Sequence, residues 1–242
     1  MLKRITGQVL PAVLAVGFVL IVRTTVAEPY SVPTPSMVPT LLVGDQLVGA
    51  KYAYGYSKYS LPLGQLPGIE GRLFGRPPER GDVVVFRLPR DPSTTFVKRL
   101  IGLPGDRIQM RQGRLYINDQ LVPRRAAGMF NGDKLYVETL PASTDGTTRE
   151  HEIVEISDSA RHDDTGVYIV PAGHYFMMGD NRDDSLDSRV PASEGGVGFV
   201  PEENLVARVD RLLLSRDPDV GWLEIGRWTQ AFRLGRTFGH ID

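Results

Sequence analysis

The chain has 242 residues, of which 41% are hydrophobic and 24% charged, a balance that supports one large globular domain or a domain with an insert. A formal net charge of −1 gives no bulk field that would favour nucleic acid as a partner. The sequence contains no cysteine, which excludes disulfides, thiol catalysis and cysteine-ligated metal sites. Abundant glycine (26) and proline (18) favour many short strands and turns over a helical bundle.

An uncharged segment, residues 5–22, is the first predicted element. As a helix it would be about 27 Å long, close to the hydrocarbon thickness of a bilayer. Lys3 and Arg4 precede the segment and Arg23 follows it. By the positive-inside rule, residues 1–4 form a cytoplasmic tail and the remainder of the chain is exported. The segment is therefore interpreted as an uncleaved transmembrane anchor.

Two alternatives remain for the same segment. A secretory signal cleaved after Ala27 is compatible with the small residues before that position. A buried helix of a soluble protein is disfavoured, because Pro11 and Gly17 weaken a soluble helix but are tolerated in lipid.

Short apolar and alternating runs follow, separated by turn residues, and they predict a mainly β fold. Gln112-Gly113 is predicted to be the turn of a hairpin. A more polar stretch, residues 124–165, is interpreted as an insert or cap. The strand candidates are residues 42–56 (strand, then loop), 82–86, 95–101, 107–110, 114–117, 134–140, 151–156, 167–170, 174–178 and 205–214.

The first stretch with chemical potential is PTPSMVPTL, residues 33–41. Ser36 lies between Pro35 and Pro39, in a chain that these prolines are expected to hold extended. A serine presented so rigidly is a candidate nucleophile. The alternative is an ordinary Pro/Ser/Thr linker behind a membrane anchor.

The second stretch is FVKRLIGLPGD, residues 96–106. On a strand, Lys98 shares a face with Phe96 and Leu100, while Arg99 points the opposite way. An ordinary lysine, with a pKa of about 10.4, is only about 0.1% neutral near pH 7.5. Burial lowers a lysine pKa, so Lys98 is a candidate general base for a serine hydroxyl. The alternative is a lysine whose stem packs while its head reaches water.

The third stretch, GDNRDDSLDSR at residues 179–189, contains four aspartates, two arginines and two serines. Its spacing does not fit a calcium-binding EF-hand loop, and a solvated acidic turn is the remaining alternative. Ser36 lacks the G-x-S-x-G pattern of many Ser–His–Asp hydrolases. No metal site is predicted, because the histidines have no metal-ligand spacing: His151, His162, His174 and His240.

In this order, and together with RGDVVVF (80–86) and GFVP (198–201), the three stretches resemble the boxes of the type I signal peptidase (leader peptidase) family. The resemblance runs from the anchor to about residue 215. It implies that Ser36 is the nucleophile and Lys98 the general base of a Ser–Lys dyad.

The resemblance also implies how the oxyanion is held. Thr34 stands where the family commonly has a serine whose hydroxyl helps to bind the oxyanion, and a threonine hydroxyl can still donate. Pro35 replaces the glycine usually found before the nucleophile and has no N–H. The oxyanion hole is therefore expected to use the Ser36 N–H and the Thr34 hydroxyl.

Supporting roles follow from the last box. By resemblance, Ser185 hydrogen-bonds the dyad lysine and orients it, and Asp187 and Arg189 brace the loop. An ion pair between Asp180 and Arg99, on the strand face away from the cleft, is a further hypothesis.

The implied activity is that of a membrane-bound serine endopeptidase that cleaves N-terminal signal peptides from exported preproteins through an acyl-enzyme. It needs no metal or cofactor. The strand at Phe96-Val97 is expected to pair with the substrate backbone as an added β-strand. The expected location is the bacterial inner (cytoplasmic) membrane, single-pass, with the catalytic domain on the outer (periplasmic) side. Preproteins and the lipid bilayer are the expected partners, and nucleic acid is not.

The expected fold is a many-stranded antiparallel catalytic β domain, residues 28–123 and 166–242, with a β-rich insert at 124–165 and one N-terminal transmembrane helix. The segment 221–238, with Trp222 and several arginines, is either a second membrane contact or a tail packed on the domain. Two alternative functions remain: a Ser–Lys peptidase with another substrate, such as a conjugation-type peptidase, or a non-enzymatic membrane-anchored β-rich binding protein.

Overall fold

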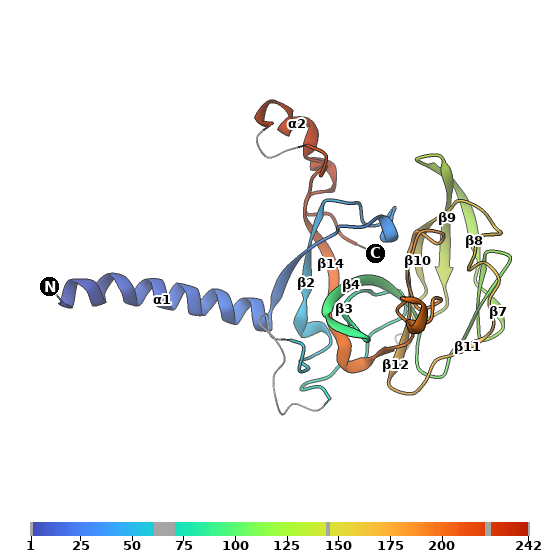
Figure 1. The fold of residues 1–242 in the computed structure, drawn as a ribbon, viewed down its shortest axis with the longest axis horizontal. Coiled ribbons are helices and arrows are strands. Elements are labelled where there is room, and N and C mark those ends of the chain that lie inside the picture. Colours follow the sequence, from blue (N-terminus) through green and yellow to red (C-terminus); the bar gives the residue numbers. More distant parts are fainter. Residues whose placement is uncertain (1, 61–70, 144–145, 221–223, 242) are drawn as a thin grey trace.

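The computed structural model describes the backbone of residues 2–60, 71–143, 146–220 and 224–241, without the side chains of residues 2–9, 225, 228 and 230. Helix α1, Leu2–Thr25, projects away from a body of β-strands (Figure 1). Within the described residues, no helix combines the length and the apolar character needed to cross a bilayer. The start of the expected anchor, residues 5–9, lies outside the described side chains.

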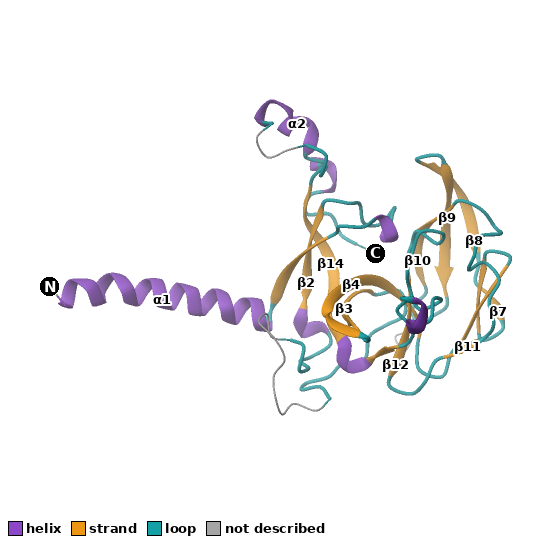
Figure 2. Cartoon of the chain, viewed as in Figure 1, coloured by secondary structure: helices purple, strands orange, loops and turns teal. Residues whose placement is uncertain are grey.

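The largest sheet is antiparallel and seven-stranded, in the order β1-β2-β14-β3-β4-β12-β13. Figure 2 labels its strands β2, β14, β3, β4 and β12. In chain order its strands are β1 (Ala27–Ser31), β2 (Asp45–Ala50), β3 (Val83–Leu88), β4 (Asp91–Gly102), β12 (His174–Met178), β13 (Val200–Pro201) and β14 (Leu205–Ser215).

Two smaller antiparallel sheets lie beside it. One, in the order β11-β5-β6-β7, comprises Tyr168–Ile169, Arg107–Arg111, Arg114–Ile117 and Gln120–Leu121. The other, in the order β10-β9-β8, comprises Arg149–Glu155, Asp133–Leu140 and Arg124–Phe130. The short helices are α2 (Trp228–Ala231) and the 3-10 turns Pro35–Met37, Lys51–Ala53, Ala192–Glu194, Glu202–Asn204, Ile225–Arg227 and Leu234–Arg236.

The mainly β, antiparallel class predicted from the sequence is confirmed. The predicted hairpin is present as β5–β6, and both of its turn residues adopt positive φ, 50° at Gln112 and 68° at Gly113. Four strands were not predicted: β1, β8 and the two-residue strands β7 and β13. Pro29 obscures β1, which tolerates a proline because it is an edge strand. The small and charged residues of β8 (RRAAGMF) give no strand pattern.

Strand β3 explains how the body holds a buried site. Val83 and Val85 pack into one hydrophobic cluster, whereas Val84 and Phe86 pack into another on the opposite face. A strand buried on both faces reads as a continuous apolar run rather than an alternating one. Its partner β4 is thereby drawn into the interior, with Lys98 opposite Val84.

The C-terminal segment leaves β14, forms α2 at a distance from the sheets and returns to them (Figure 1). Arg233 and Arg236 attach the returning part, since they donate to the Val43 and Thr40 carbonyls respectively. Phe238 remains exposed. Trp222, named above in the predicted membrane-contact segment, lies outside the described residues.

Candidate active site

Ser36 lies at the centre of a tight turn. Thr34 is extended (φ −129°, ψ 153°), but Pro35–Met37 form one 3-10 turn, so the expectation of an extended chain is wrong at the serine itself. Pro35 fits the first position of the turn because its fixed φ suits a helix and its missing N–H is not needed there. Met37 packs beneath the turn in the core, leaving Ser36 9% exposed.

Lys98 extends from β4 toward this turn, and its Nζ contacts the Ser36 Oγ directly. The residue is only 4% exposed, and its ammonium lies 5.8 Å from the centre of the Phe96 ring. Thr34 completes the group, with its Oγ1 3.3 Å from the Ser36 Oγ. A candidate base, a candidate nucleophile and a second hydroxyl therefore lie in one contact.

Burial governs the charge of Lys98. Loss of solvent lowers the pKa of its amine from 10.5 to about 8, and the carboxylates of Asp187 and Asp180 oppose the shift only in part. An amine with a pKa of about 8 is about 10% neutral at pH 7 and half neutral at pH 8. A neutral amine in contact with a serine hydroxyl is able to take its proton.

A cavity of about 390 Å³ opens onto the two groups. The segments 30–37 and 95–98 form its two long walls, and Asp184 and Leu186 complete the lining. Phe96 and Val97 lie on the second wall, beside Lys98. Its lining is mostly apolar, as expected of a site that receives side chains rather than water.

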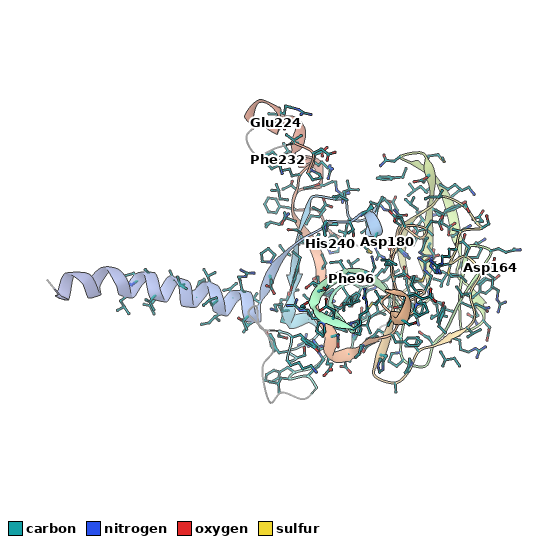
Figure 3. All side chains as sticks on the ribbon, viewed as in Figure 1. Phe96, Asp164, Asp180, Glu224, Phe232 and His240 are labelled. Carbon is teal, nitrogen blue, oxygen red and sulfur yellow. The ribbon has the colours of Figure 1, made fainter. Side chains whose placement is uncertain are left out.

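The opposite face of β4 carries a buried ion pair. Arg99 donates from Nε and Nη2 to the two carboxylate oxygens of Asp180, both at 2.9 Å, and from Nη1 to the Gly81 carbonyl at 2.8 Å. Asp180 also accepts from the Thr40 hydroxyl at 2.6 Å. Figure 3 shows Asp180 and Phe96 within the β body. The pair therefore links β4, the strand that carries Lys98, to the segment after Ser36 and to the 179–189 loop.

The 179–189 loop is closed by a second buried pair. Arg189 donates to both carboxylate oxygens of Asp187, at 3.0 and 2.9 Å, and Asp187 also accepts from the Gly179 N–H at 3.0 Å. Burial alone would raise the pKa of Asp187, but the Arg189 guanidinium holds it below its ordinary value. Asp187 therefore stays ionised, and the loop keeps a fixed shape next to Lys98.

The chain matches the family described as signal peptidase, peptidase S26, over residues 5–213. The chain belongs to this peptidase family. It is 41% identical over 238 residues to the signal peptidase I of Rickettsia typhi (strain ATCC VR-144 / Wilmington), covering 92% of this chain and 88% of the relative. To that of Rickettsia massiliae (strain Mtu5) it is 40% identical over 245 residues, covering 95% and 90%.

A signal peptidase I crystal structure from Enterococcus faecalis V583 is 26% identical in sequence, with a TM-score of 0.33. It covers 55% of this chain and 97% of its own.

Ser185 departs from the role implied by this peptidase family. Its Oγ is buried, yet it forms no hydrogen bond within the described part of the chain, so the expected bond to Lys98 is absent. The Lys98 amine contacts the Ser36 hydroxyl instead. Ser185 nevertheless lies beside the dyad, because a Cβ placed on Gly179 would overlap both the Ser185 Oγ and the Ser36 carbonyl oxygen.

Two residues of the GDN tripeptide were not singled out in the sequence. The Asn181 N–H donates to the Ser36 carbonyl at 3.2 Å, and its side-chain amide donates to the Pro35 carbonyl at 3.3 Å. Gly179 permits the close approach that these bonds require. The only local signal was a glycine followed by two polar residues, and the partner of this tripeptide, the Ser36 turn, is far away in sequence.

The β10-β9-β8 sheet contributes another unpredicted group. Arg182 donates to both carboxylate oxygens of Glu138, and His151 lies between carboxylates, 3.5 Å from Glu138 and 3.9 Å from Asp180. Burial, with the nearby guanidiniums of Arg99 and Arg182, holds the pKa of His151 well below its ordinary value. The histidine is therefore neutral and lies under the Arg99–Asp180 pair rather than in the cavity.

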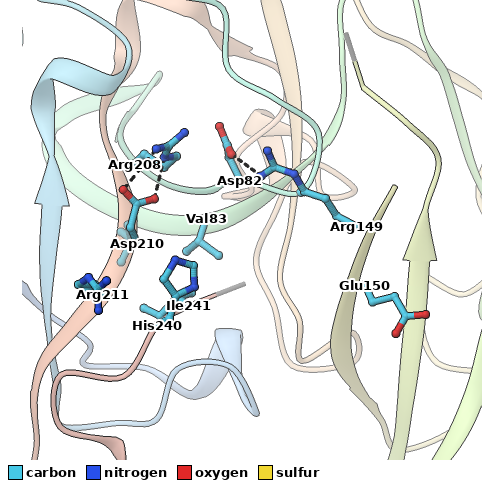
Figure 4. Close-up of a pocket in the computed structure, with 11 residues that line it drawn as sticks. Asp82, Val83, Arg149, Glu150, Arg208, Asp210, Arg211, His240 and Ile241 are labelled. Carbon is cyan, nitrogen blue, oxygen red and sulfur yellow. Dashed lines mark hydrogen bonds and ion pairs between the residues drawn. The ribbon is translucent and has the colours of Figure 1, made fainter. Parts of the chain in front are cut away.

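A larger cavity, about 730 Å³, lies elsewhere, between β14 and the start of β10. Two ion pairs flank it, Arg208 with Asp210 and Arg149 with Asp82 (Figure 4). The described residues that line it include no serine or lysine, so it offers no pair comparable to Ser36 and Lys98.

Proposed function

We propose that this chain is a membrane-bound serine endopeptidase that removes N-terminal signal peptides from exported preproteins. The observation that carries the proposal is the contact between the buried Lys98 amine and the Ser36 hydroxyl at the edge of an apolar cavity. Membership of the signal peptidase family supports the same substrate class.

In the proposed reaction, neutral Lys98 takes the proton of Ser36 as the serine oxygen attacks the scissile carbonyl. The Ser36 N–H and the Thr34 hydroxyl hold the oxyanion, since Pro35 has no N–H to offer. Protonated Lys98 then gives its proton to the leaving amine. Water hydrolyses the remaining ester and restores the serine. Two buried ion pairs hold β4 and the 179–189 loop in place: Asp180 with Arg99, and Asp187 with Arg189. No metal or cofactor takes part in the proposed reaction.

The substrate is proposed to bind as an extended strand along Phe96 and Val97. Strand β12 pairs with β4 only from Arg99 to Gly102, which leaves this part of β4 without a strand partner on that side within the described residues. Main-chain pairing would bind many sequences, and the resemblance to the signal peptidase family implies small side chains at the first and third positions before the cut. This combination suits an enzyme whose substrates share little sequence.

The location proposed is the outer face of the bacterial inner membrane, with residues 5–22 as a single anchor. The charges on either side of this segment support the orientation. An extended chain from Val22 to Ser36 spans at most about 50 Å, so the serine works near the membrane surface, where the cleavage site of a signal peptide emerges. Lys51 donates to the Arg23 carbonyl and Tyr56 to the Thr25 carbonyl, which ties the end of α1 to the β body.

The domain organisation proposed is a catalytic β domain, residues 28–123 and 166–242, with residues 124–165 as an insert. Within the described residues, strands β8, β9 and β10 of the insert form a sheet of their own. The insert contacts the loop near the serine, since Val154 donates to the Asp180 carbonyl and accepts from the Arg182 N–H, both at 2.9 Å.

The test is cleavage of a preprotein by the detergent-solubilised full chain, read on a gel and by N-terminal sequencing of the product. Ser36→Ala and Lys98→Met should each abolish cleavage. Lys58→Met is the matched control, because Lys58 is partly exposed and pairs with Glu203 outside the cavity. Full activity in Ser36→Ala or Lys98→Met would refute the mechanism, and a wild-type chain that cleaves no preprotein would refute the function.

A further inference from the structure

The 179–189 loop carries four aspartates, and three of them form ion pairs or hydrogen bonds with other residues of the protein. Each of the three has a defined partner: Asp180 binds Arg99, Asp187 binds Arg189, and Asp183 accepts from the backbone N–H groups of Ile156 and Ser157 at 2.8 and 3.0 Å. These contacts fix the backbone before and after residue 184. The loop therefore has a set shape without any contribution from the fourth carboxylate.

Asp184 is that fourth carboxylate. Its side chain is exposed and forms no hydrogen bond or ion pair with any described residue. It lines the cavity that contains Ser36 and Lys98, and these two charged groups, Asp184 and Lys98, are the only ones among the described lining residues. Because this carboxylate has no partner among the described residues and lies at the cavity, its charge is available to interact with a bound substrate.

The field of Asp184 reaches the reacting groups. Burial is the main influence on the pKa of Lys98 and lowers it, and Asp184 is one of the carboxylates that act in the opposite direction. Charges interact over about 8 Å at physiological ionic strength before salt screens them. Adjacent residues of an extended substrate are only about 3.3 Å apart, so side chains on both sides of the scissile bond come within this range.

We propose that Asp184 gives this peptidase a charge preference: it favours substrates with lysine or arginine next to the scissile bond and disfavours those with aspartate or glutamate there. The inference rests on the proposed function and adds a specificity-determining residue to it. The positions concerned are the second residue before the cut and the first after it, since small side chains are proposed above for the first and third positions before the cut.

The expected size follows from Coulomb's law. Two unit charges about 7 Å apart in a largely aqueous environment change a rate constant by about threefold. Exchanging lysine for glutamate reverses the sign of the substrate charge, so the wild-type ratio of kcat/KM should be about five- to tenfold in favour of lysine. Because the interaction is exposed to solvent, the ratio should shrink as salt is added.

The experiment is a competition between two preproteins that differ only by lysine or glutamate at one of these positions. Competition gives a ratio of kcat/KM that does not depend on how much of the enzyme is active. In Asp184→Asn, which keeps the side-chain shape, the ratio should fall at least threefold and lose most of its salt dependence. Glu152→Gln is the matched control, because Glu152 is exposed on β10 and does not line this cavity. Its ratio should equal that of the wild type.

Two results would overturn the inference: no preference in the wild type at either position, or an unchanged ratio in Asp184→Asn. Asp184→Glu and Asp184→Ser extend the series, with the preference kept in the first and lost in the second. Loss of all cleavage in the three variants would also overturn it, since Asp184 would then be needed for the reaction or the fold rather than for selection. A wild-type chain that cleaves neither preprotein contradicts the proposed function instead.

Discussion

Replacing the buried lysine by methionine should abolish cleavage and at the same time stabilise the fold. In the folded chain, burial lowers the pKa of Lys98 from 10.5 to about 8, a difference that corresponds to about 3 kcal/mol. The unfolded chain binds the proton more tightly, so ionisation of Lys98 destabilises the folded state at every pH below about 8. This penalty fades as pH rises from about 8 to 10.5. Methionine is of similar length, carries no charge, and removes the penalty.

The measurement is urea-induced unfolding of the detergent-solubilised full chain, followed by far-UV circular dichroism at pH 7 and pH 10. Lys98→Met should be more stable than the wild type by up to about 3 kcal/mol at pH 7, and by less than about 1 kcal/mol at pH 10. Loss of the contact to Ser36 offsets part of the gain, although the Thr34 hydroxyl remains 3.3 Å from that serine. A variant that is less stable at pH 7, or a gain that does not change with pH, would refute a desolvated Lys98.

Three further predictions concern the surroundings of the dyad. Thr34→Val should lower kcat by about 10²-fold because it removes a proposed oxyanion donor, whereas Thr34→Ser should keep most of the activity in the same cleavage assay. Asp180→Asn should reduce the free energy of unfolding by about 3–5 kcal/mol, since Arg99 is 1% exposed and would lose its counter-charge; an unchanged urea midpoint would contradict this. Ser185→Ala should leave stability within about 0.5 kcal/mol, because the hydroxyl forms no hydrogen bond among the described residues. A fall in its kcat would then report a role during the reaction.

The sequence predicted the parts of the site that depend on local periodicity. Alternation along β4 separates Lys98 from Arg99, and the continuous apolar run of β3 explains why the Lys98 face is buried. The hairpin at Gln112-Gly113 was equally local, because Gly113 readily adopts the positive φ that the second turn position requires.

Features that depend on distant segments were not predictable in this way. The hydrogen bond from Asn181 to Ser36 joins residues that are far apart in the sequence. Nothing in either segment indicates that the other lies next to it. The 3-10 turn at Ser36 was missed because proline favours an extended preceding residue but also suits the first position of a turn. The neutral His151 beneath Asp180 is defined by three packed elements, and its burial has no local signature.

The most direct test of the dyad is the pH dependence of kcat/KM for preprotein cleavage by the wild-type chain. If neutral Lys98 removes the proton of Ser36, the rate should rise with pH along a limb of apparent pKa about 8, roughly fivefold between pH 7 and pH 8. A limb near 10.5 would show that the amine is solvated like an ordinary lysine. A rate independent of pH across this interval would show that the base is a different group.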